Sequence, residues 1–284
     1  ARRAAVCGAR AARAGAAIEG SFYHERRGSY ALDKRADGTR TWTQTALTAV
    51  AILLGAVNPV RARKFLDALG GDGFSARWGV RLLPTGDPLF NAAAYHAGAV
   101  WPLFTGWAAL AEFRAGRGPA GFRHLMANAR LAFVRQGGAF DEVLHGLEER
   151  TAGVCPDQAW SAAMVLVPLV EGLLGVEPDA PGGKLTLVPQ LPDNVEWLEV
   201  TGVRCGESVY DLRVRRRARD VTIAVRHTVG PPLWLTVGTW LASLPETVEV
   251  DGEAVQPEVT AWGTGMRCAV VFQAGAEHEV RFSG

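Results

Sequence analysis

Glu142 stands beside Asp141 in the otherwise apolar run of residues 140–144 and is the residue of this sequence best placed to do chemistry. Its neighbours include Phe140, Val143 and Leu144, and the stretch of residues 139–163 joins two helical patterns. A carboxylate in apolar surroundings suits proton transfer, because loss of water and nearby dipoles control its protonation. On spacing alone, a residue of this kind more often caps or ion-pairs the following helix.

The elements that would position Glu142 are helices. Apolar residues recur at helical spacing before and after it, and Asn58 followed by Pro59 is a typical start for a helix that ends at Gly70-Gly71. The pattern predicts helices over residues 2–18, 42–54, 58–69, 95–114, 121–135 and 157–174. Chains of helical hairpins bury one face against each other and leave their connections on one rim, where a site can form.

One connection in the helical part is unusually long. Residues 74–94 contain Pro84, Gly86, Asp87-Pro88 and Asn91 and have little helical pattern. Ordered loops of this length in a compact domain tend to be functional. We therefore count this loop among the candidate parts of a site.

The period of the sequence changes after Pro178. Pro181-Gly182-Gly183 is a linker, and short alternating stretches follow that are typical of β-strands. We expect strands over residues 184–189, 196–203, 208–216, 220–226, 233–236, 247–250, 268–272 and 278–282. The predicted fold is mainly α with a C-terminal β domain: a helical-hairpin domain over residues 1–180 and an antiparallel β-sandwich over residues 181–284.

Composition excludes several classes of partner. The chain has 30 basic and 29 acidic residues and a net charge of +1, so it offers no general field for nucleic acid or a membrane surface. The run Arg215–Arg217 is interpreted as a solvated sheet edge. The longest apolar run, residues 46–57, is too short to span a membrane.

The four cysteines lie far apart, without a CxxC pair or a histidine cluster at ligand spacing. This pattern argues against a metal site or a disulfide framework, and it fits a reducing, cytoplasmic compartment. We expect no cofactor. The oligomeric state is not indicated by the sequence.

The first residues form a helix-like Ala/Arg stretch without an initiating Met. An Arg-rich, acid-poor start can imitate a transit peptide. The favoured interpretation is that the sequence is the C-terminal part of a longer protein.

Two motifs carry a resemblance to a known family. Residues 95–102, YHAGAVWP, resemble the YHxGxxWP element of the six-hairpin glycosidases. Glu142-Val143-Leu144-His145-Gly146 with Cys155-Pro156-Asp157-Gln158 resembles the glutamate loop and last barrel helix of the glycogen-debranching (amylo-α-1,6-glucosidase) group. Residues 189–192, PQLP, and the strands after them resemble the β domain that often follows such barrels.

The resemblance implies an (α/α)6 toroid, of which this sequence holds the final six of twelve helices. It implies that Glu142 is the general base that activates water in an inverting hydrolysis. Such a reaction also needs a protonated carboxyl group about 6.5–9.5 Å from the base. In the family this acid lies on an earlier part of the barrel, and we expect it to lie outside this chain. The alternative is one of the loop aspartates before residue 95, which are Asp33, Asp37, Asp72 and Asp87.

A sugar site needs an aromatic face beside polar groups, because the C–H face of a pyranose packs on the ring while its hydroxyl groups are hydrogen-bonded. The resemblance favours His96 and Trp101 for this role. Further candidates for substrate binding are Trp78, Arg81, His145, Gln158 and Trp160. Each has a plainer alternative: loop packing for Trp78 and Arg81, a solvent-facing ring for His145, capping of its own helix for Gln158, and helix packing for Trp160.

Three functions stay open at this stage. The first is a glycoside hydrolase that acts without a metal on α-1,6 branches of glycogen-like glucan. The second is a glycosidase of the same architecture for another sugar, such as a trehalase-like, mannosidase-like or rhamnosidase-like enzyme, because fold does not fix substrate. The third is a non-catalytic carbohydrate-binding fragment. All three have an oligo- or polysaccharide as the partner.

Overall fold

The structure is a computed structural model of the chain and describes residues 2–134, 137–262 and 265–284. Contacts within it divide the chain into two compact units. The helical unit comprises Ala1–Arg114 and Arg123–Pro168, and the β unit comprises Ala115–Phe122 and Leu169–Gly284. A helical domain followed by a C-terminal β domain was the predicted fold class, and this much is confirmed. The predicted boundary at residues 180–181 stays a prediction.

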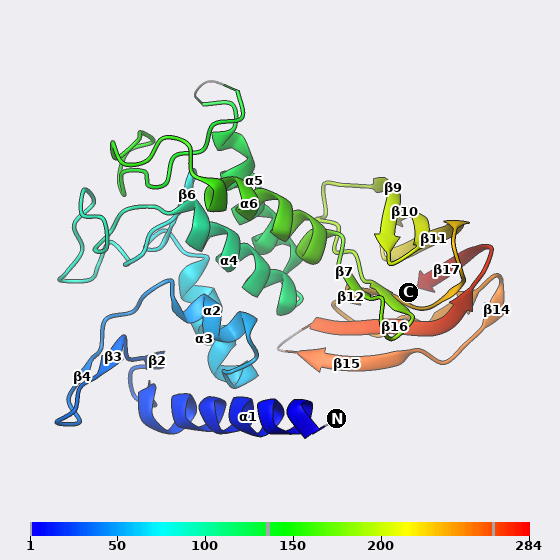
Figure 1. Cartoon of the computed structure of the whole chain (residues 1–284), viewed down its shortest axis with the longest axis horizontal. Coiled ribbons are helices and arrows are strands. Elements are labelled where there is room, and N and C mark those ends of the chain that lie inside the picture. Colours follow the sequence, from blue (N-terminus) through cyan, green and yellow to red (C-terminus); the bar gives the residue numbers. More distant parts are fainter. Residues whose placement is uncertain (1, 135–136, 263–264) are drawn as a thin grey trace. The chain divides into compact units, whose positions relative to one another are not determined.

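Six α-helices form among the described residues, and Figure 1 shows them in blue to green. Their bounds are α1 Arg2–Phe22, α2 Thr48–Leu53, α3 Pro59–Leu69, α4 Pro102–Arg114, α5 Gly118–Leu131 and α6 Ala159–Val167. Helix α3 begins as the sequence predicted, because the Asn58 side chain accepts hydrogen bonds from the N–H groups of Val60 and Arg61. The predicted end of α5 at Arg135 lies outside the described residues.

Three predicted helices are shorter than expected, and the one predicted over residues 95–114 begins only at Pro102. Helix α2 starts at Thr48 rather than at Trp42, and the Thr45 hydroxyl accepts from the N–H of Leu47, a local bond that competes with helix formation. Helix α6 ends at Val167 because Pro168 has no N–H to donate. The chain continues there as one π-helical turn, η1, Pro168–Leu173.

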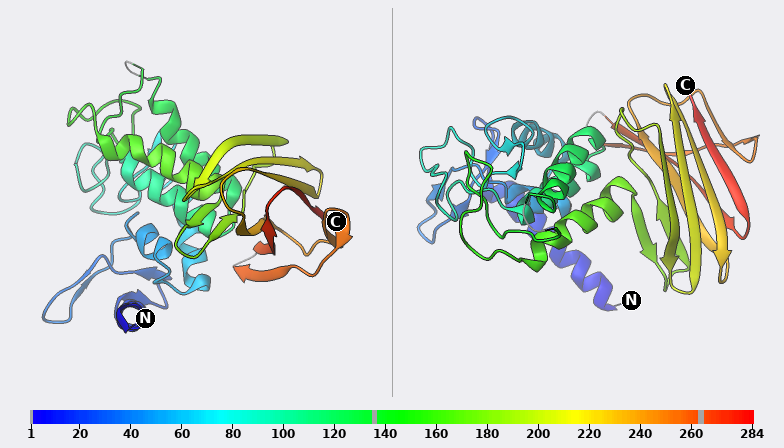
Figure 2. Two further views of the ribbon diagram at one scale, coloured as in Figure 1. Left: turned by 45° about the vertical axis from the view of Figure 1, so that its right-hand side comes forward. Right: turned by 90° about the horizontal axis from the view of Figure 1, so that it is seen from above.

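Helices α4 and α6 pack closely along each other in the helical unit (Figures 1 and 2). A Cβ atom added at Gly106 of α4 would lie 2.4 Å from the Cβ of Met164 on α6, so the glycine permits the close approach. Asn128 of α5 ties both helices together: its Nδ2 donates to the carbonyl of Pro102 at 2.8 Å and to that of Met164 at 3.1 Å.

Short hairpins connect the helices. They pair β1 Tyr23–His24 with β2 Ser29–Tyr30, β3 Asp33–Lys34 with β4 Arg40–Thr41, and β5 Ser75–Ala76 with β6 Gly79–Val80. The last hairpin lies in the long loop of residues 74–94, which is otherwise irregular as predicted. Its strand β6 contacts α4.

The β unit is a sandwich of two sheets, as Figure 2 shows. One sheet has the strand order β14-β13-β17-β11-β10-β9 and the other β15-β16-β12-β8-β7. The strands are β7 Val176–Asp179, β8 Lys184–Leu187, β9 Trp197–Cys205, β10 Ser208–Arg217, β11 Asp220–Val229, β12 Leu233–Leu241, β13 Thr247–Val250, β14 Glu253–Ala254, β15 Glu258–Trp262, β16 Gly265–Ala274 and β17 Glu277–Ser283.

The two sheets bury a single apolar core between them. Leu185 and Leu235 of one sheet and Tyr210, Ile223 and Phe282 of the other have no measurable exposure. Alternation along the strands produces this, because every second side chain points to the same face. The Tyr210 hydroxyl is also paired: it donates to the carbonyl of Ala274 at 3.1 Å and accepts from the N–H of Leu233 at 2.9 Å.

Two expectations about the sheets were wrong. The sandwich is not wholly antiparallel, because β8 pairs with β12 in parallel, with Leu185 opposite Leu235. The run Arg215–Arg217 does not form a sheet edge, because β10 lies between β9 and β11. Its side chains instead alternate: Arg215 and Arg217 are exposed and Arg216 is half-buried.

No helix among the described residues is long and apolar enough to cross a membrane.

Candidate active site

The Glu142 loop between α5 and α6 is held by backbone pairing. Leu144 exchanges hydrogen bonds with Val100, N–H to carbonyl, at 2.8 and 2.9 Å. Val100 also forms a bridge with Arg81, and Leu144 forms one with Thr151. The N–H of Glu142 donates to the carbonyl of Cys155 at 2.9 Å. The loop is therefore fixed against the start of α4 rather than free in solvent.

Glycines bring the loop close to the segment before α4. A Cβ atom at Gly146 would lie 2.3 Å from the carbonyl oxygen of Gly98, and one at Gly98 would lie 2.7 Å from that of Asn91. The N–H of Gly146 donates to the carbonyl of Ala92 at 2.9 Å. The two motifs that carried the family resemblance thus contact each other directly, and their glycines make the contact possible.

Glu142 is buried, with 6% of its surface exposed. Its Oε1 accepts a hydrogen bond of 2.8 Å from the hydroxyl of Tyr95. Among the described residues no hydrogen bond is recorded for Oε2. One oxygen is therefore fixed and the other is left to accept a proton, which is the arrangement that a general base requires.

Tyr95 is a member of the site that the sequence did not single out. Burial, and then its hydrogen bond to the Glu142 carboxylate, raise the pKa of Tyr95 above its usual value. The hydroxyl therefore keeps its proton and acts as a donor. Its place at the head of the YHxGxxWP element was the available signal.

Three aromatic rings gather beside Glu142. Tyr95 lies edge-on to Trp101, with 4.4 Å between ring centroids. His96 stacks on Trp101 at 5.8 Å, with 15° between the ring planes. Trp101 is buried and its indole N–H donates to the carbonyl of Tyr95 at 2.9 Å, whereas His96 is exposed. Trp101 supports the cluster from its buried side, and Tyr95 and His96 are both exposed.

Trp78 and Arg81 of the long loop brace the Glu142 loop from another side. The Trp78 indole N–H donates to the carbonyl of His145 at 3.0 Å, and the Arg81 Nε donates to that of Gly146 at 2.6 Å. Arg81 Nη1 reaches the carbonyls of Asp72, Gly73 and Ser75. Burial lowers the pKa of Arg81, against the opposing effect of Asp72. These contacts place both side chains in support of the loop.

His145 follows the candidate base by three positions and is buried, with 9% exposure. Its Nδ1 accepts from the N–H of Leu147 at 3.3 Å and lies 3.9 Å from Glu148 Oε1. These contacts lie within its own loop, and none of them reaches Glu142. The alternative of a solvent-facing ring was wrong, because His145 is buried.

Gln158 and Trp160 begin α6. Gln158 occupies the N-cap position, but its side chain makes no capping hydrogen bond, so the capping alternative was wrong. Its N–H donates to the carbonyl of Phe140 at 2.8 Å, which ties the helix start to the Glu142 loop. Trp160 is 42% exposed.

The other carboxylates near the sequence motifs have local partners. Asp141 accepts from the Thr151 hydroxyl at 3.2 Å. Asp33, Asp37 and Asp87 accept from the N–H groups of residues two or eight positions later and so stabilise turns and hairpins. The described residues contain no cluster of three or more side chains suited to a metal ion.

A family model for the mannosylglycerate hydrolase MGH1-like glycoside hydrolase domain matches residues 1–161. This range includes Tyr95, Glu142 and every other candidate site residue. None of the curated proteins matches the chain significantly.

Solved glycosidase structures also resemble the chain. The α-L-rhamnosidase from Dictyoglumus thermophilum matches with a TM-score of 0.54 and 8% identity, over 95% of this chain and 28% of that one. The GH63 mannosylglycerate hydrolase from Thermus thermophilus matches with a TM-score of 0.47 and 19% identity, over 54% of this chain and 37% of that one. The GH78 rhamnosidase of Bacillus sp. GL1 matches with a TM-score of 0.45 and 19% identity, over 76% of this chain and 20% of that one. The chain spans well under half the length of each.

Proposed function

The chain belongs to the mannosylglycerate hydrolase MGH1-like glycoside hydrolase family, and from this we propose that it is the base-bearing part of an inverting glycosidase. One observation carries the proposal. Glu142 is a buried carboxylate with one oxygen fixed by Tyr95 and a neighbouring ring, His96, exposed for a sugar. Trp78, Arg81, Trp101, His145 and Gln158 have contacts in or beside this loop, and we keep them, together with the exposed Trp160, as candidates for substrate binding.

In the proposed reaction, Glu142 Oε2 takes a proton from a water molecule as the water oxygen bonds to the anomeric carbon. The glycosidic C–O bond breaks on the opposite face, and an acid must protonate the departing oxygen. We infer that this acid comes from a part of the protein outside this sequence. The short span of the chain relative to its structural neighbours supports that inference.

The family membership also supports a proposal for the architecture of the helical unit. We propose that the six helices are half of an (α/α)6 toroid, with the Glu142 loop and the long loop of residues 74–94 on the rim that holds the site. The likeness to the rhamnosidase, at a TM-score of 0.54 over nearly the whole chain, supports this fold.

For the substrate we propose an α-linked glycoside of the mannosyl type. The family description supports it, whereas an α-1,6-glucan substrate keeps only the motif resemblance as its support. Because the acid is inferred to lie outside this sequence, a panel of mannosylglycerate, aryl α-mannosides, aryl rhamnosides, trehalose and limit dextrin would be assayed with a longer protein that supplies it, and kcat/KM would rank these candidates. The highest kcat/KM on limit dextrin would reverse our preference.

Glycosyl fluorides give the direct test of Glu142, because fluoride leaves without protonation and the missing acid is bypassed. We expect the chain to hydrolyse α-D-mannosyl fluoride and to release β-mannose first, as inversion requires. Glu142→Gln should lower kcat by roughly 10²–10⁴-fold, the usual contribution of a general base. Released fluoride and the anomer seen by proton NMR are the measurements.

Glu148→Gln is the matched control. It makes the same chemical change in the same loop, but Glu148 is exposed and pairs with Arg150 at 2.9 Å. We expect its kcat to be unchanged. A Glu142→Gln variant with a near-normal rate would remove Glu142 from the mechanism. Sugar binding without any hydrolysis of the fluoride would favour the non-catalytic carbohydrate-binding alternative.

A further inference from the structure

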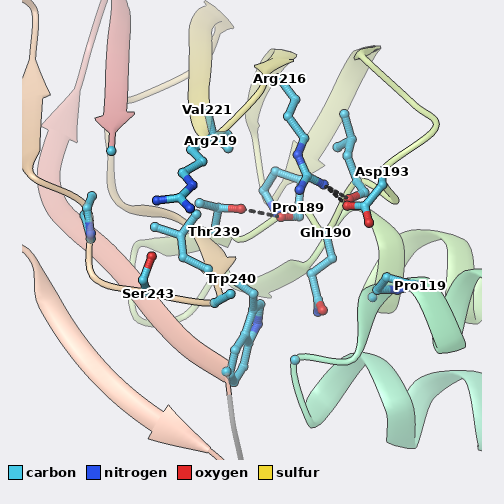
Figure 3. A pocket seen from close by; sticks show the side chains of 18 of the residues that line it. Pro119, Pro189, Gln190, Asp193, Arg216, Arg219, Val221, Thr239, Trp240 and Ser243 are labelled. Carbon is cyan, nitrogen blue, oxygen red and sulfur yellow. Dashed lines mark hydrogen bonds and ion pairs between the residues drawn. The ribbon is translucent and has the colours of Figure 1, made fainter.

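The β unit contains a cavity of about 360 Å³ that the candidate active site does not use. Its lining comes from the strand ends of β10, β11 and β12, from the segment after β8 and from residues 115–119, all within the β unit (Figure 3). Glu142 belongs to the helical unit. The volume falls within the range of about 300–1,000 Å³ that small-molecule sites occupy.

Trp240 supplies an aromatic surface to this cavity and is half-buried. Two glycines hold its indole in place. A Cβ atom at Gly116 would lie 2.3 Å from the Trp240 Cε3, and one at Gly265 would lie 3.2 Å from the same atom. Gly116 also has a left-handed backbone, with φ of 68°. The ring is therefore fixed before any ligand binds, which reduces the entropy lost on binding.

Polar groups stand across the cavity from the indole. Arg216 Nη1 lies 2.9 Å from Asp193 Oδ1 and donates to the carbonyl of Leu191 at 3.1 Å. Gln190, 8% exposed, points into the space between Trp240 and Pro119 (Figure 3). Because Asp193 balances the charge of Arg216, the pair carries no net charge and offers neighbouring donors and an acceptor.

Arg219 adds a further donor from a strained turn. Arg217 pairs with Asp220, so Ala218 and Arg219 alone connect β10 to β11. Ala218 has φ of 53°, a left-handed conformation that a non-glycine residue rarely adopts. Arg219 is exposed at the cavity and has no recorded hydrogen bond or ion pair among the described residues. Backbone strain of this kind concentrates where a structure positions a functional side chain.

We propose that this cavity is a second saccharide-binding site. It takes a neutral sugar whose apolar face rests on Trp240 and whose hydroxyl groups bond to Arg216, Asp193, Gln190 and Arg219. An aromatic face beside in-plane donors and acceptors is the combination that a pyranose requires. The site is independent of the proposed catalysis, since it would hold a glycan whether or not Glu142 acts as a base.

Calorimetric titration of the full 284-residue chain tests the proposal. The neutral probes are maltose, isomaltose, α-1,2-mannobiose and L-rhamnose; the anionic probes are inorganic phosphate and D-glycerate. We expect at least one neutral probe to bind, in the wild type and equally in Glu142→Gln. Trp240→Ala and Arg219→Ala should each weaken that binding by ten-fold or more.

Arg215→Ala is the matched control, because Arg215 is an exposed arginine of the same hairpin that does not line the cavity. It should bind the neutral probe like the wild type. Arg219→Ala changes only an exposed side chain, so it keeps the test valid if Trp240→Ala fails to fold. Binding of the anions alone, no binding of any neutral probe, or binding unchanged in Arg219→Ala would overturn the proposal. Absence of fluoride hydrolysis by the wild type, with neutral-sugar binding intact, would overturn only the proposed catalytic role of Glu142.

Discussion

The hydrogen bond between Tyr95 and Glu142 is the most important contact of the candidate site, because it orients the Glu142 carboxylate. It joins the first residue of one motif to the glutamate of the other across 47 positions of sequence. A donor to one carboxylate oxygen fixes the direction in which the second oxygen points. Tyr95 therefore acts as a positioning residue for the proposed base.

Removal of this donor should affect turnover more than binding. We expect Tyr95→Phe to lower kcat on α-D-mannosyl fluoride about ten-fold, with KM little changed, because a hydrogen bond to a charged group contributes about 1.5–3 kcal/mol. Tyr23→Phe is the control, since Tyr23 packs on Arg61 and does not contact the site. In a Glu142→Gln background Tyr95→Phe should have no further effect; a full additional ten-fold loss would show that Tyr95 acts independently.

Ala218 allows a second prediction at single-residue scale. A left-handed backbone costs a residue with a Cβ about 1–2 kcal/mol, whereas glycine adopts it freely but loses about 0.5–1 kcal/mol in entropy. Ala218→Gly should therefore stabilise the β unit by about 0.5 kcal/mol. Thermal unfolding measures the change, with Ala224→Gly in the middle of β11 as a control that should destabilise. A lower midpoint for Ala218→Gly would show that the turn is not strained.

At the scale of elements, Glu19 joins α1 to the start of α3. Its Oε1 accepts from the Tyr30 hydroxyl and from the N–H of Asn58, both at 2.6 Å, and its Oε2 pairs with Arg61. Burial favours a higher pKa for Glu19, but the hydrogen bonds from Tyr30, Asn58 and Arg61 outweigh it, so the pKa lies below its usual value. The carboxylate thus links three segments of the helical unit.

A lowered carboxyl pKa has a definite consequence for stability. The contribution of Glu19 is fully present above the unfolded pKa, about 4.5, and is lost as the pH falls through the lower pKa of the folded state. Glu19→Gln should lower the free energy of unfolding by about 1–2 kcal/mol at pH 7 and by much less below pH 4. Urea unfolding at both pH values is the measurement.

Glu25→Gln is the control for this prediction. Glu25 also pairs with Arg61, but its side chain is 74% exposed, so its loss should cost well under about 1 kcal/mol. An equal loss for Glu19→Gln at pH 7 and below pH 4 would show that shape, rather than charge, makes the Glu19 contact important.

The elements that the sequence predicted well are those that local chemistry determines. Asn58 and Pro59 start α3, and Asp251-Gly252 forms the two-residue turn between β13 and β14, with positive φ at both positions. Tertiary contacts decided the rest. The sequence could not show that β8 runs parallel to β12 or that β10 lies inside its sheet, because each depends on a partner far along the chain.

The candidate site divides in the same way. The family motifs identified Glu142 and the residues around it, because the residues of each motif lie close together in the sequence. Tyr95 became a partner of Glu142 only through the pairing of Val100 with Leu144, which brings the two motifs together. The cavity beside Trp240 had no signal at all, since its lining is drawn from residues 115 to 284.

At the scale of the whole molecule, the residue at which the β sandwich begins decides whether the C-terminal half of the chain can fold alone. Strand β7 precedes the predicted boundary at residues 180–181 yet pairs with β8, with Val176 opposite Leu187. Leu174 and Val176 are 6% exposed and belong to the sandwich core. A protein that begins at residue 181 would lose both side chains and leave β8 as an open edge.

Two truncated proteins, residues 169–284 and residues 181–284, test this directly. Full burial of an aliphatic side chain contributes about 1.5–3 kcal/mol, so loss of Leu174 and Val176 should destabilise the shorter protein by about 3 kcal/mol or more. It should also associate, because the exposed β8 edge can pair with another chain. Urea unfolding and sedimentation velocity measure the two effects. Equal stability and a monomeric shorter protein would place the domain boundary where the sequence predicted it, and β7 would then be an addition to a sheet that is complete without it.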